Sequence, residues 1–221
     1  MFYDIDTVKI LEIELTTFCN ANCGACDRNI NGSYVNPKMP LEHMSLDTWK
    51  SLITAENLKY ITTVTFDGNF GDAAMHPKML EMLEYMATIK HDIFVKVSSN
   101  GGARNEEFWK GLAEVLNKFS FHEMQFAVDG LEDTNHIYRR NVIWKKLISN
   151  ITAFNQAGGI STWRAIIFDH NKHQVNDMML LAGELGCYKF KTYRNRTTPI
   201  ELTAYKNLPA GTITSPTTAE F

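Results

Sequence analysis

Apolar and polar residues alternate along the chain in two patterns, one typical of strands and one typical of helices. Short runs rich in β-branched and aromatic residues predict six strands, at about residues 8–16, 60–66, 93–97, 124–128, 163–168 and 188–193. Apolar residues at helical spacing predict helices between them, at about residues 45–56, 79–86, 105–116, 142–156 and 174–185. Ser45 and Asn105 precede two of these helices as N-cap residues, whereas residues 30–44 carry turn signals.

Strands that alternate with helices of this length predict a parallel sheet with right-handed crossovers. Six strand–helix units are too few for a full eight-unit barrel, which usually needs about 250 residues. The sequence therefore predicts an α/β fold, a partial (β/α)6 TIM-like barrel with parallel strands, over residues 1–194. In such a barrel functional groups gather at the carboxyl ends of the strands, where the glycine-, asparagine- and aspartate-rich segments fall.

Residues 195–221 differ from the rest of the chain in composition and are predicted to form an irregular C-terminal tail. Three of the six prolines fall in this stretch, which is rich in threonine and has no helical period.

Composition narrows the class of protein. The 221 residues are 44% hydrophobic and 21% charged, as in an ordinary globular chain, and the net charge of −3 gives no reason to expect a nucleic-acid partner. No apolar run is long enough to cross a bilayer, and the N-terminus lacks the features of a secretory signal, so no membrane partner is expected. Three of the four cysteines cluster, unlike a disulfide framework, which indicates a reducing cytoplasm.

Cys19, Cys23 and Cys26 follow the first predicted strand with the spacing C-x3-C-x2-C. Thiolates are the soft ligands that select iron–sulfur clusters, zinc or Cu(I). A cubane [4Fe–4S] cluster normally takes four cysteines, so three would leave one iron open to a small molecule. A zinc knot or simply buried thiols are the alternatives. Zinc would need a fourth ligand, either Cys187 or a nearby histidine such as His43, and no second C-x-x-C pair supports it.

This cysteine spacing after a first strand resembles the signature of the radical S-adenosylmethionine (radical SAM) enzymes. The resemblance implies that Cys19, Cys23 and Cys26 hold a [4Fe–4S] cluster whose open iron chelates the amino and carboxylate groups of SAM. It also implies reductive cleavage of SAM to a 5′-deoxyadenosyl radical, which abstracts hydrogen from a substrate. The chain is thus expected to be an iron–sulfur oxidoreductase that takes electrons from a donor such as flavodoxin or ferredoxin.

Two further segments resemble SAM-binding motifs of that family. Residues 70–77 resemble its G-G-E-P segment followed by L-x-H-P, which implies that Gly71 and Asp72 meet the SAM amino group. The match departs where phenylalanine, aspartate and alanine replace glycine, glutamate and proline, and Asp72 could instead make a local bond in a turn. Residues 98–101 resemble T-N-G, which implies that Asn100 contacts the ribose or the methionyl group, although asparagine before glycine is also a common turn.

Residues 127–130 and 138–139 resemble the S-[LI]-D-G…R pattern of the peptide-modifying (maturase-like) branch. The resemblance implies that Asp129 belongs to the SAM site and that Arg139 pairs with the SAM carboxylate, which a guanidinium fork suits. Ala127 stands where that pattern has serine. Arg140 is an alternative partner, a loop with two solvated arginines is a second alternative, and Asp129 could instead stabilise the loop or bind substrate.

The peptide-modifying branch is the nearest fit, with a small molecule or a peptide as substrate. Its cysteine-rich C-terminal domain with auxiliary clusters has no counterpart in this sequence, which does not distinguish a short chain from a truncated one. One alternative is an enzyme of the 7-carboxy-7-deazaguanine synthase type, whose third cysteine is followed by Asp-Thr where this chain has Asp27-Arg28. The other is a non-catalytic iron–sulfur or metal-binding module.

Overall fold

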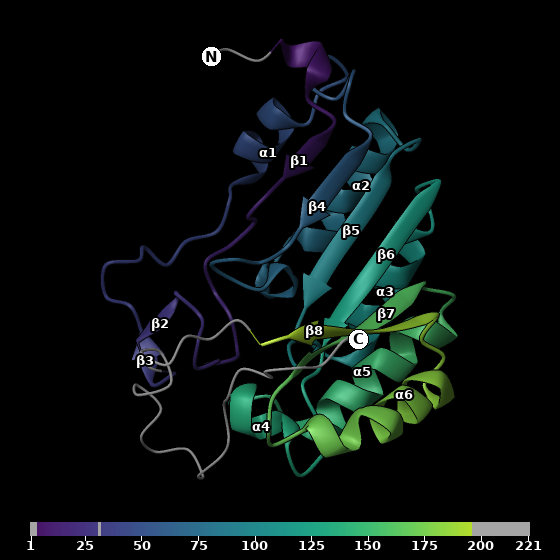
Figure 1. The fold of residues 1–221 in the computed structure, drawn as a ribbon. Helices are drawn as coiled ribbons and strands as arrows, with labels where there is room; N and C mark the ends of the chain where they lie inside the picture. Colours follow the sequence, from purple (N-terminus) through teal and green to yellow (C-terminus); the bar gives the residue numbers. More distant parts are fainter. Residues whose placement is uncertain (1–3, 31, 196–221) are drawn as a thin grey trace.

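Six parallel strands form one open sheet in the part of the chain that the structure describes, residues 4–30 and 32–195 (Figure 1). The computed structural model gives the sheet the order β1 (Ile10–Glu12), β4 (Thr63–Phe66), β5 (Phe94–Ser99), β6 (Phe121–Ala127), β7 (Ser161–Ile167) and β8 (Lys189–Arg194). Every neighbouring pair is parallel. The predicted α/β fold, a partial (β/α)6 barrel, is confirmed.

The helices that connect successive strands lie along one side of the sheet, which we call its outer face (Figure 1). They are α1 (Leu46–Leu52), α2 (Met79–Ile89), α3 (Glu106–Leu116), α5 (Trp144–Gln156) and α6 (Val175–Glu184). Phe126 of β6 packs between two of them, with its ring centroid 5.3 Å from that of Trp109 and 5.7 Å from that of Phe154. All three rings are fully buried, so the hydrophobic core lies between the outer face and the helices.

The opposite side of the sheet, its inner face, carries polar side chains at the alternate positions of the same strands. Parallel pairing arranges these residues in rows, because partners in neighbouring strands share a face. One row contains Glu12, Thr65, Lys96 and Glu123, and another contains Ser98, Gln125 and Thr162. The interior of a closed barrel is usually filled by bulky branched apolar residues. This inner face is instead suited to contact a polar ligand.

Two helices begin at their predicted capping residues. The side chains of Ser45 and Asn105 each accept a backbone N–H three residues further on, at 3.0 and 3.2 Å. Helix α1 is shorter than its apolar pattern predicts, because it ends at Leu52 and not near residue 56. The Asn57 side chain donates to the carbonyl of Leu52 at 2.9 Å and so satisfies one of the acceptors that a helix end leaves open.

The chain between β1 and α1 differs most from the sequence prediction. The strand predicted at residues 8–16 makes ladder pairs only in β1, and the chain then leaves the sheet to form the cysteine loop. A hairpin follows, in which β2 (Asn29–Ile30) pairs antiparallel with β3 (Tyr34–Val35). Strands of two residues are too short to carry a hydrophobic period, so the sequence predicted only turns here.

Four further short elements were not predicted: η1 (Ile5–Thr7), η2 (Ala73–Met75), α4 (Asn135–Tyr138) and η3 (Lys172–Gln174). The last three follow β4, β6 and β7, at the carboxyl end of the sheet where the cysteine loop also lies. Apart from Asn195, the predicted tail of residues 195–221 lies outside the described residues. Within the described ranges, the structure contains no helix with the length and apolar character needed to span a membrane.

Candidate functional site

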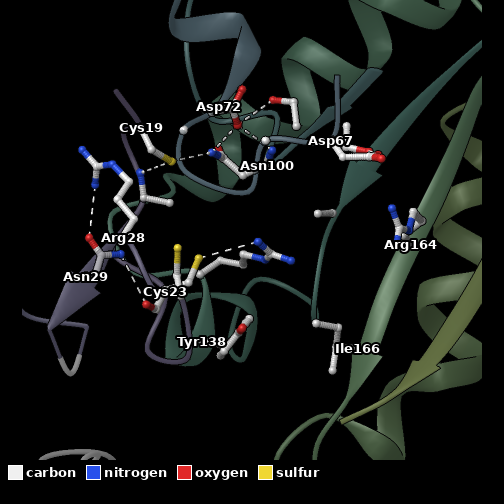
Figure 2. Close-up of a pocket in the computed structure, with 18 of the residues that line it drawn as sticks. Cys19, Cys23, Arg28, Asn29, Asp67, Asp72, Asn100, Tyr138, Arg164 and Ile166 are labelled. Carbon is white, nitrogen blue, oxygen red and sulfur yellow. Dashed lines mark hydrogen bonds between the residues drawn. The ribbon is translucent and has the colours of Figure 1, made fainter. Parts of the chain in front are cut away.

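The three cysteines of the C-x3-C-x2-C motif line one cavity at the carboxyl ends of the strands (Figure 2). The cavity has a volume of about 240 Å³. Figure 2 shows Cys19 and Cys23 on one side of it and Arg164 and Ile166 on the other. The predicted site residues Gly71, Asp72, Asn100 and Arg139 also line the cavity, whereas Asp129 does not. Residues that are far apart in sequence therefore converge on the cysteine loop.

The hairpin residues next to Cys26 hold the cysteine loop in shape. The Arg28 side chain donates from Nε to the carbonyl of Thr17 at 2.8 Å. Asn29 donates its backbone N–H to the carbonyl of Cys26 at 2.8 Å and its side-chain amide to that of Cys23 at 3.4 Å. Both side chains are buried and line the cavity, a role that the sequence analysis missed because nothing but proximity to Cys26 signalled it.

Gly71 allows the loop after β4 to pack tightly against the cysteine loop. A Cβ atom at this position would lie 2.0 Å from the carbonyl oxygen of Thr16 and 3.0 Å from that of Phe18. The neighbouring Asp72 donates its backbone N–H to the Phe18 carbonyl at 2.9 Å. Only glycine fits such an approach of two backbones, so Gly71 contributes main-chain atoms to the cavity wall.

Burial raises the pKa of two cysteine thiols in the cavity. It raises the pKa of Cys19 to about 12, and the neighbouring Asp72 carboxylate adds to the effect. It also raises the pKa of Cys23, against the opposing influence of Arg139, whose Nη1 donates to the Cys23 sulfur at 3.6 Å. A metal that binds here must therefore displace protons. Among the described residues, no three Cys, His, Asp or Glu side chains are already gathered around one metal position.

The donor set of the cavity fits a cluster with three protein ligands better than a structural zinc ion. Three soft thiols line one cavity, and the two residues that could complete a zinc site lie elsewhere. Cys187 accepts a hydrogen bond from the Asn155 side chain at 3.7 Å, on the helical side of the sheet. The His43 ring pairs with the Thr16 hydroxyl at 2.8 Å and stacks on Phe18 outside the cavity.

The Asp72 carboxylate is buried and fully engaged by protein donors. One oxygen accepts from the Ser99 hydroxyl at 2.9 Å and from the backbone and side chain of Asn100 at 2.9 and 2.6 Å. The other accepts the backbone N–H of Ala74 at 3.1 Å, which is the local turn bond that the sequence allowed. Burial raises the pKa of Asp72, although these hydrogen bonds oppose the shift. Asp72 thereby fixes Asn100, whose amide nitrogen lies 3.6 Å from the Cys19 sulfur.

Arg139 reaches the cavity from the end of α4 and is held there by Asp129. Its Nε donates to Asp129 Oδ2 at 2.6 Å, while Asp129 Oδ1 accepts the backbone N–H of Ile166 at 2.6 Å. Burial alone would lower the pKa of Arg139, but the Asp129 charge outweighs it and raises the pKa, so the guanidinium stays cationic. Asp129 is fully buried behind this pair and acts through Arg139.

The two arginines that the sequence could not separate lie in different places. Arg139 lines the cavity next to the cysteines, whereas Arg140 donates to the carbonyl of Gly32 at 2.9 Å and does not line it. Ala127, which stands where the resembled pattern has serine, also lines the cavity and leaves room there.

The inner face of the sheet supplies a part of the cavity that the sequence did not predict. Asp67 lines it from just after β4, Arg164 from β7 and Tyr193 from β8, and Lys96 forms an ion pair with Asp67 at 2.9 Å. These residues lie near the carboxyl ends of the strands, or they alternate with buried residues along a strand. Polar residues at every second position of an otherwise apolar strand were the signal that could have found them.

Comparison with known proteins finds one matching family model and several solved structures of similar fold. The family model of the radical SAM superfamily matches residues 13–182. SuiB of Streptococcus suis, solved with S-adenosylmethionine, superposes with a TM-score of 0.64 at 16% identity, over 90% of this chain and 43% of SuiB. Native anSMEcpe, solved with AdoMet, gives a TM-score of 0.63 at 15% identity, over 89% of this chain and 57% of anSMEcpe. The chain thus spans less than two thirds of either protein, and no curated protein matches it.

Proposed function

The chain belongs to the radical SAM superfamily, and from this premise we propose that it is an enzyme that binds one [4Fe–4S] cluster and S-adenosylmethionine. When bound, these cofactors supply a 5′-deoxyadenosyl radical, formed by reductive cleavage of SAM, that abstracts hydrogen from a substrate. The observation that carries the proposal is the convergence of three thiols with Arg139 and Asn100 on one cavity.

Cys19, Cys23 and Cys26 are the proposed cluster ligands. They leave one iron without a protein ligand, because no further cysteine and no histidine lines the cavity within the described residues. The Arg28 and Asn29 hydrogen bonds to the loop backbone keep the three thiols on one wall. A zinc ion would find no fourth cysteine or histidine among the described residues that line the cavity.

Arg139 is the proposed partner of the SAM carboxylate. Its Nε is committed to Asp129, so the guanidinium is fixed in orientation and its Nη1 lies beside the Cys23 sulfur. A guanidinium held by a buried carboxylate is preorganised, which reduces the entropy lost when an anion binds. Asp129 is then a positioning residue and not a direct contact of the cofactor.

Asp72 and Asn100 are proposed to shape the same site from the opposite side. Both side chains already have protein partners, and Asn100 additionally bonds the Asn20 side chain of the cysteine loop at 2.9 Å. Their role is to hold the Gly71 backbone and the cysteine loop at a fixed separation, so that the SAM amino group meets preformed acceptors.

A peptide is the proposed class of substrate, with a small molecule as the other source of the reacting C–H bond. SuiB was solved with its precursor peptide SuiA, and anSMEcpe with AdoMet and the peptide Cp18Cys. The polar inner face that borders the cavity supports a substrate with many polar groups. The proposed electron donor is a small redox protein such as flavodoxin or ferredoxin.

Anaerobic reconstitution tests this function. We expect the chain, supplied with iron and sulfide, to gain the visible absorption of an iron–sulfur cluster and to release 5′-deoxyadenosine from SAM under a strong reductant. Cys23→Ala should lose both signals, whereas the matched control Cys187→Ala should keep both, because Cys187 lies outside the cavity. A stable zinc site without a cluster, or undiminished SAM cleavage by Cys23→Ala, would contradict the proposal.

A further inference from the structure

The wall of the cavity opposite the cysteine loop carries a further arginine, Arg164 of β7 (Figure 2). Two contacts fix its guanidinium. Nη1 donates to Gln125 Oε1 at 2.6 Å, and the guanidinium carbon lies 4.5 Å from the ring centroid of Tyr193. Stacking on an aromatic ring leaves the edge of the guanidinium plane, with its remaining N–H groups, free to bind a ligand.

The amide that orients Arg164 is itself locked in place. Gln125 Nε2 donates to Glu123 Oε2 at 2.9 Å, so its oxygen must face Arg164. Glu123 in turn accepts a hydrogen bond from the Thr162 hydroxyl. This chain of hydrogen bonds across β6 and β7 holds the guanidinium in a preorganised position before any ligand is bound.

Arg164 has no carboxylate partner among the described residues, unlike Lys96 and Lys191 on the same face. Lys96 pairs with Asp67 at 2.9 Å and Lys191 pairs with Glu123 at 3.8 Å. Lys189 also lies on the inner face without an ion pair among the described residues, but it does not line the cavity. On this wall Arg164 is therefore the cation that lines the cavity without a carboxylate to offset its charge.

The two neighbouring carboxylates, Asp67 and Glu123, do not neutralise Arg164. Burial alone would raise the pKa of Asp67 and of Glu123, but hydrogen bonds and nearby lysines outweigh it and lower both values. Asp67 forms an ion pair with Lys96, and Glu123 accepts a hydrogen bond from Thr162. Both carboxylates are therefore engaged by partners other than Arg164.

We propose that Arg164 anchors a carboxylate of the substrate on the inner face of the sheet, across the cavity from the cysteine loop. The inference rests on the proposed function of that cavity. A single carboxylate matches the single charge of Arg164, whereas a doubly charged phosphate would meet stronger repulsion from Asp67 and Glu123. The Cβ of Ala127, the pairing partner of Arg164 in β6, leaves space beside the guanidinium for such a group.

The carboxylate of SAM is assigned to Arg139 and is distinct from the substrate carboxylate at Arg164. Arg139 contacts Cys23, while Arg164 lies with Tyr193 on the far wall. Two fixed guanidinium groups on facing walls would place a cofactor carboxylate at one and a substrate carboxylate at the other, with the reacting C–H bond between them.

The test uses the reconstituted chain with SAM and two sets of probes. One set holds N-acetylated, C-terminally amidated hexapeptides that differ only by Glu or Gln at one position, and the other holds N-acetylated amino acids and their amides. Equilibrium dialysis with mass spectrometry measures the probes retained by the wild-type chain, Arg164→Gln, Arg164→Lys and the exposed-charge control Lys110→Gln, which lies in α3 on the outer side of the sheet. Release of 5′-deoxyadenosine from SAM is followed in parallel.

We expect the wild-type chain and Lys110→Gln to retain the acid-bearing probes about tenfold better than the neutral ones, as a charge-assisted hydrogen bond would give. Arg164→Gln should lose this preference, and Arg164→Lys should retain part of it because it keeps the charge but not the fork. A preference within the hexapeptide set identifies a peptide side chain as the source, and a preference only among amino acids identifies a small acid.

Equal retention of acid and neutral probes by the wild-type chain would overturn the inference, as would an unchanged preference in both Arg164 variants. Weaker binding of SAM itself by Arg164→Gln would also overturn it, by assigning Arg164 to the cofactor. Absence of SAM cleavage by the wild-type chain, with the acid preference intact, would instead contradict the proposed function and leave the anion site standing.

Discussion

The outer and inner faces of the sheet are built from alternate residues of the same strands, but the outer face packs against helices and the inner face borders the cavity. Trp163 of β7 faces outward, is fully buried and donates its indole N–H to the carbonyl of Val128 at 2.9 Å. Arg164, the next residue, faces inward and lines the cavity. The outer face stabilises the fold by burying apolar area, while the inner face holds charged groups in position for a ligand. Substitutions on the two faces should therefore change different quantities.

The largest difference is expected between these two neighbouring residues. Trp163→Ala should lower the free energy of unfolding by about 3–5 kcal/mol, because it leaves a large cavity under the helices. Arg164→Gln should lower it by about 1 kcal/mol or less, since it removes one hydrogen bond beside the cavity. Urea unfolding of both variants measures the contrast, and equal losses would contradict the division of the two faces.

Arg139 is the expected exception among the cavity residues, because its partner Asp129 is fully buried. Arg139→Gln should cost about 3 kcal/mol of unfolding free energy by leaving an uncompensated carboxylate in the interior. Adding Asp129→Asn should restore part of that stability without restoring SAM binding. The two single variants and the double variant, compared by urea unfolding, test this coupling. Simple additivity of the two losses would show that the pair does not act as a unit.

Gly71→Ala tests how closely the two loops of the site must approach. The added Cβ would meet the Thr16 carbonyl, so we expect a loss of about 1–3 kcal/mol and a lower iron content after reconstitution. Gly183→Ala is the matched control, because nothing lies within 4 Å of a Cβ at that position of α6. It should raise stability by up to about 1 kcal/mol and leave iron content unchanged. Normal iron content in Gly71→Ala would argue against the tight packing.

The smallest effect is expected from His122, a buried polar residue of β6 on the outer face. Burial lowers its pKa, and its Nε2 accepts the backbone N–H of Ile160 at 3.1 Å, so the folded chain holds it neutral. Below the ordinary value of about 6.5 the unfolded chain takes up a proton that the folded chain does not. Stability should therefore fall as the pH drops through the window below that value, and less steeply in His122→Gln. Parallel pH profiles for the two proteins would contradict this assignment.

The sequence predicted the outer face well because burial imposes a period on it. Trp163 stands between two polar residues and Phe126 follows one, and a helix that covers them begins at a recognisable cap, Asn105. The order of the strands followed from the alternation of the two patterns, since parallel crossovers leave few other arrangements.

The site was predictable only where chemistry leaves a mark on the local sequence. The spacing of Cys19, Cys23 and Cys26 identified one wall of the cavity, and resemblance to family motifs identified Asn100 and Arg139. The burial of Asp129 behind Arg139 depends on how α4 folds back, which no local pattern encodes.

The inner face left a weaker mark on the sequence. In the sequence Arg164 is a single polar residue within a predicted strand. Only the pairing register shows that it faces the cavity beside Gln125. The hairpin residues Arg28 and Asn29 carried no signal beyond their position, because strands of two residues have no period to detect.

The central claim is that three thiols leave one iron open to SAM within this cavity. Electron paramagnetic resonance of the reduced, reconstituted protein tests it most directly, with and without added SAM, and with Arg139→Lys as a comparison. We predict a spectrum of one [4Fe–4S] cluster that changes when SAM is added and changes less at the same SAM concentration in Arg139→Lys. A spectrum that SAM leaves unaltered in the wild-type chain would contradict the account.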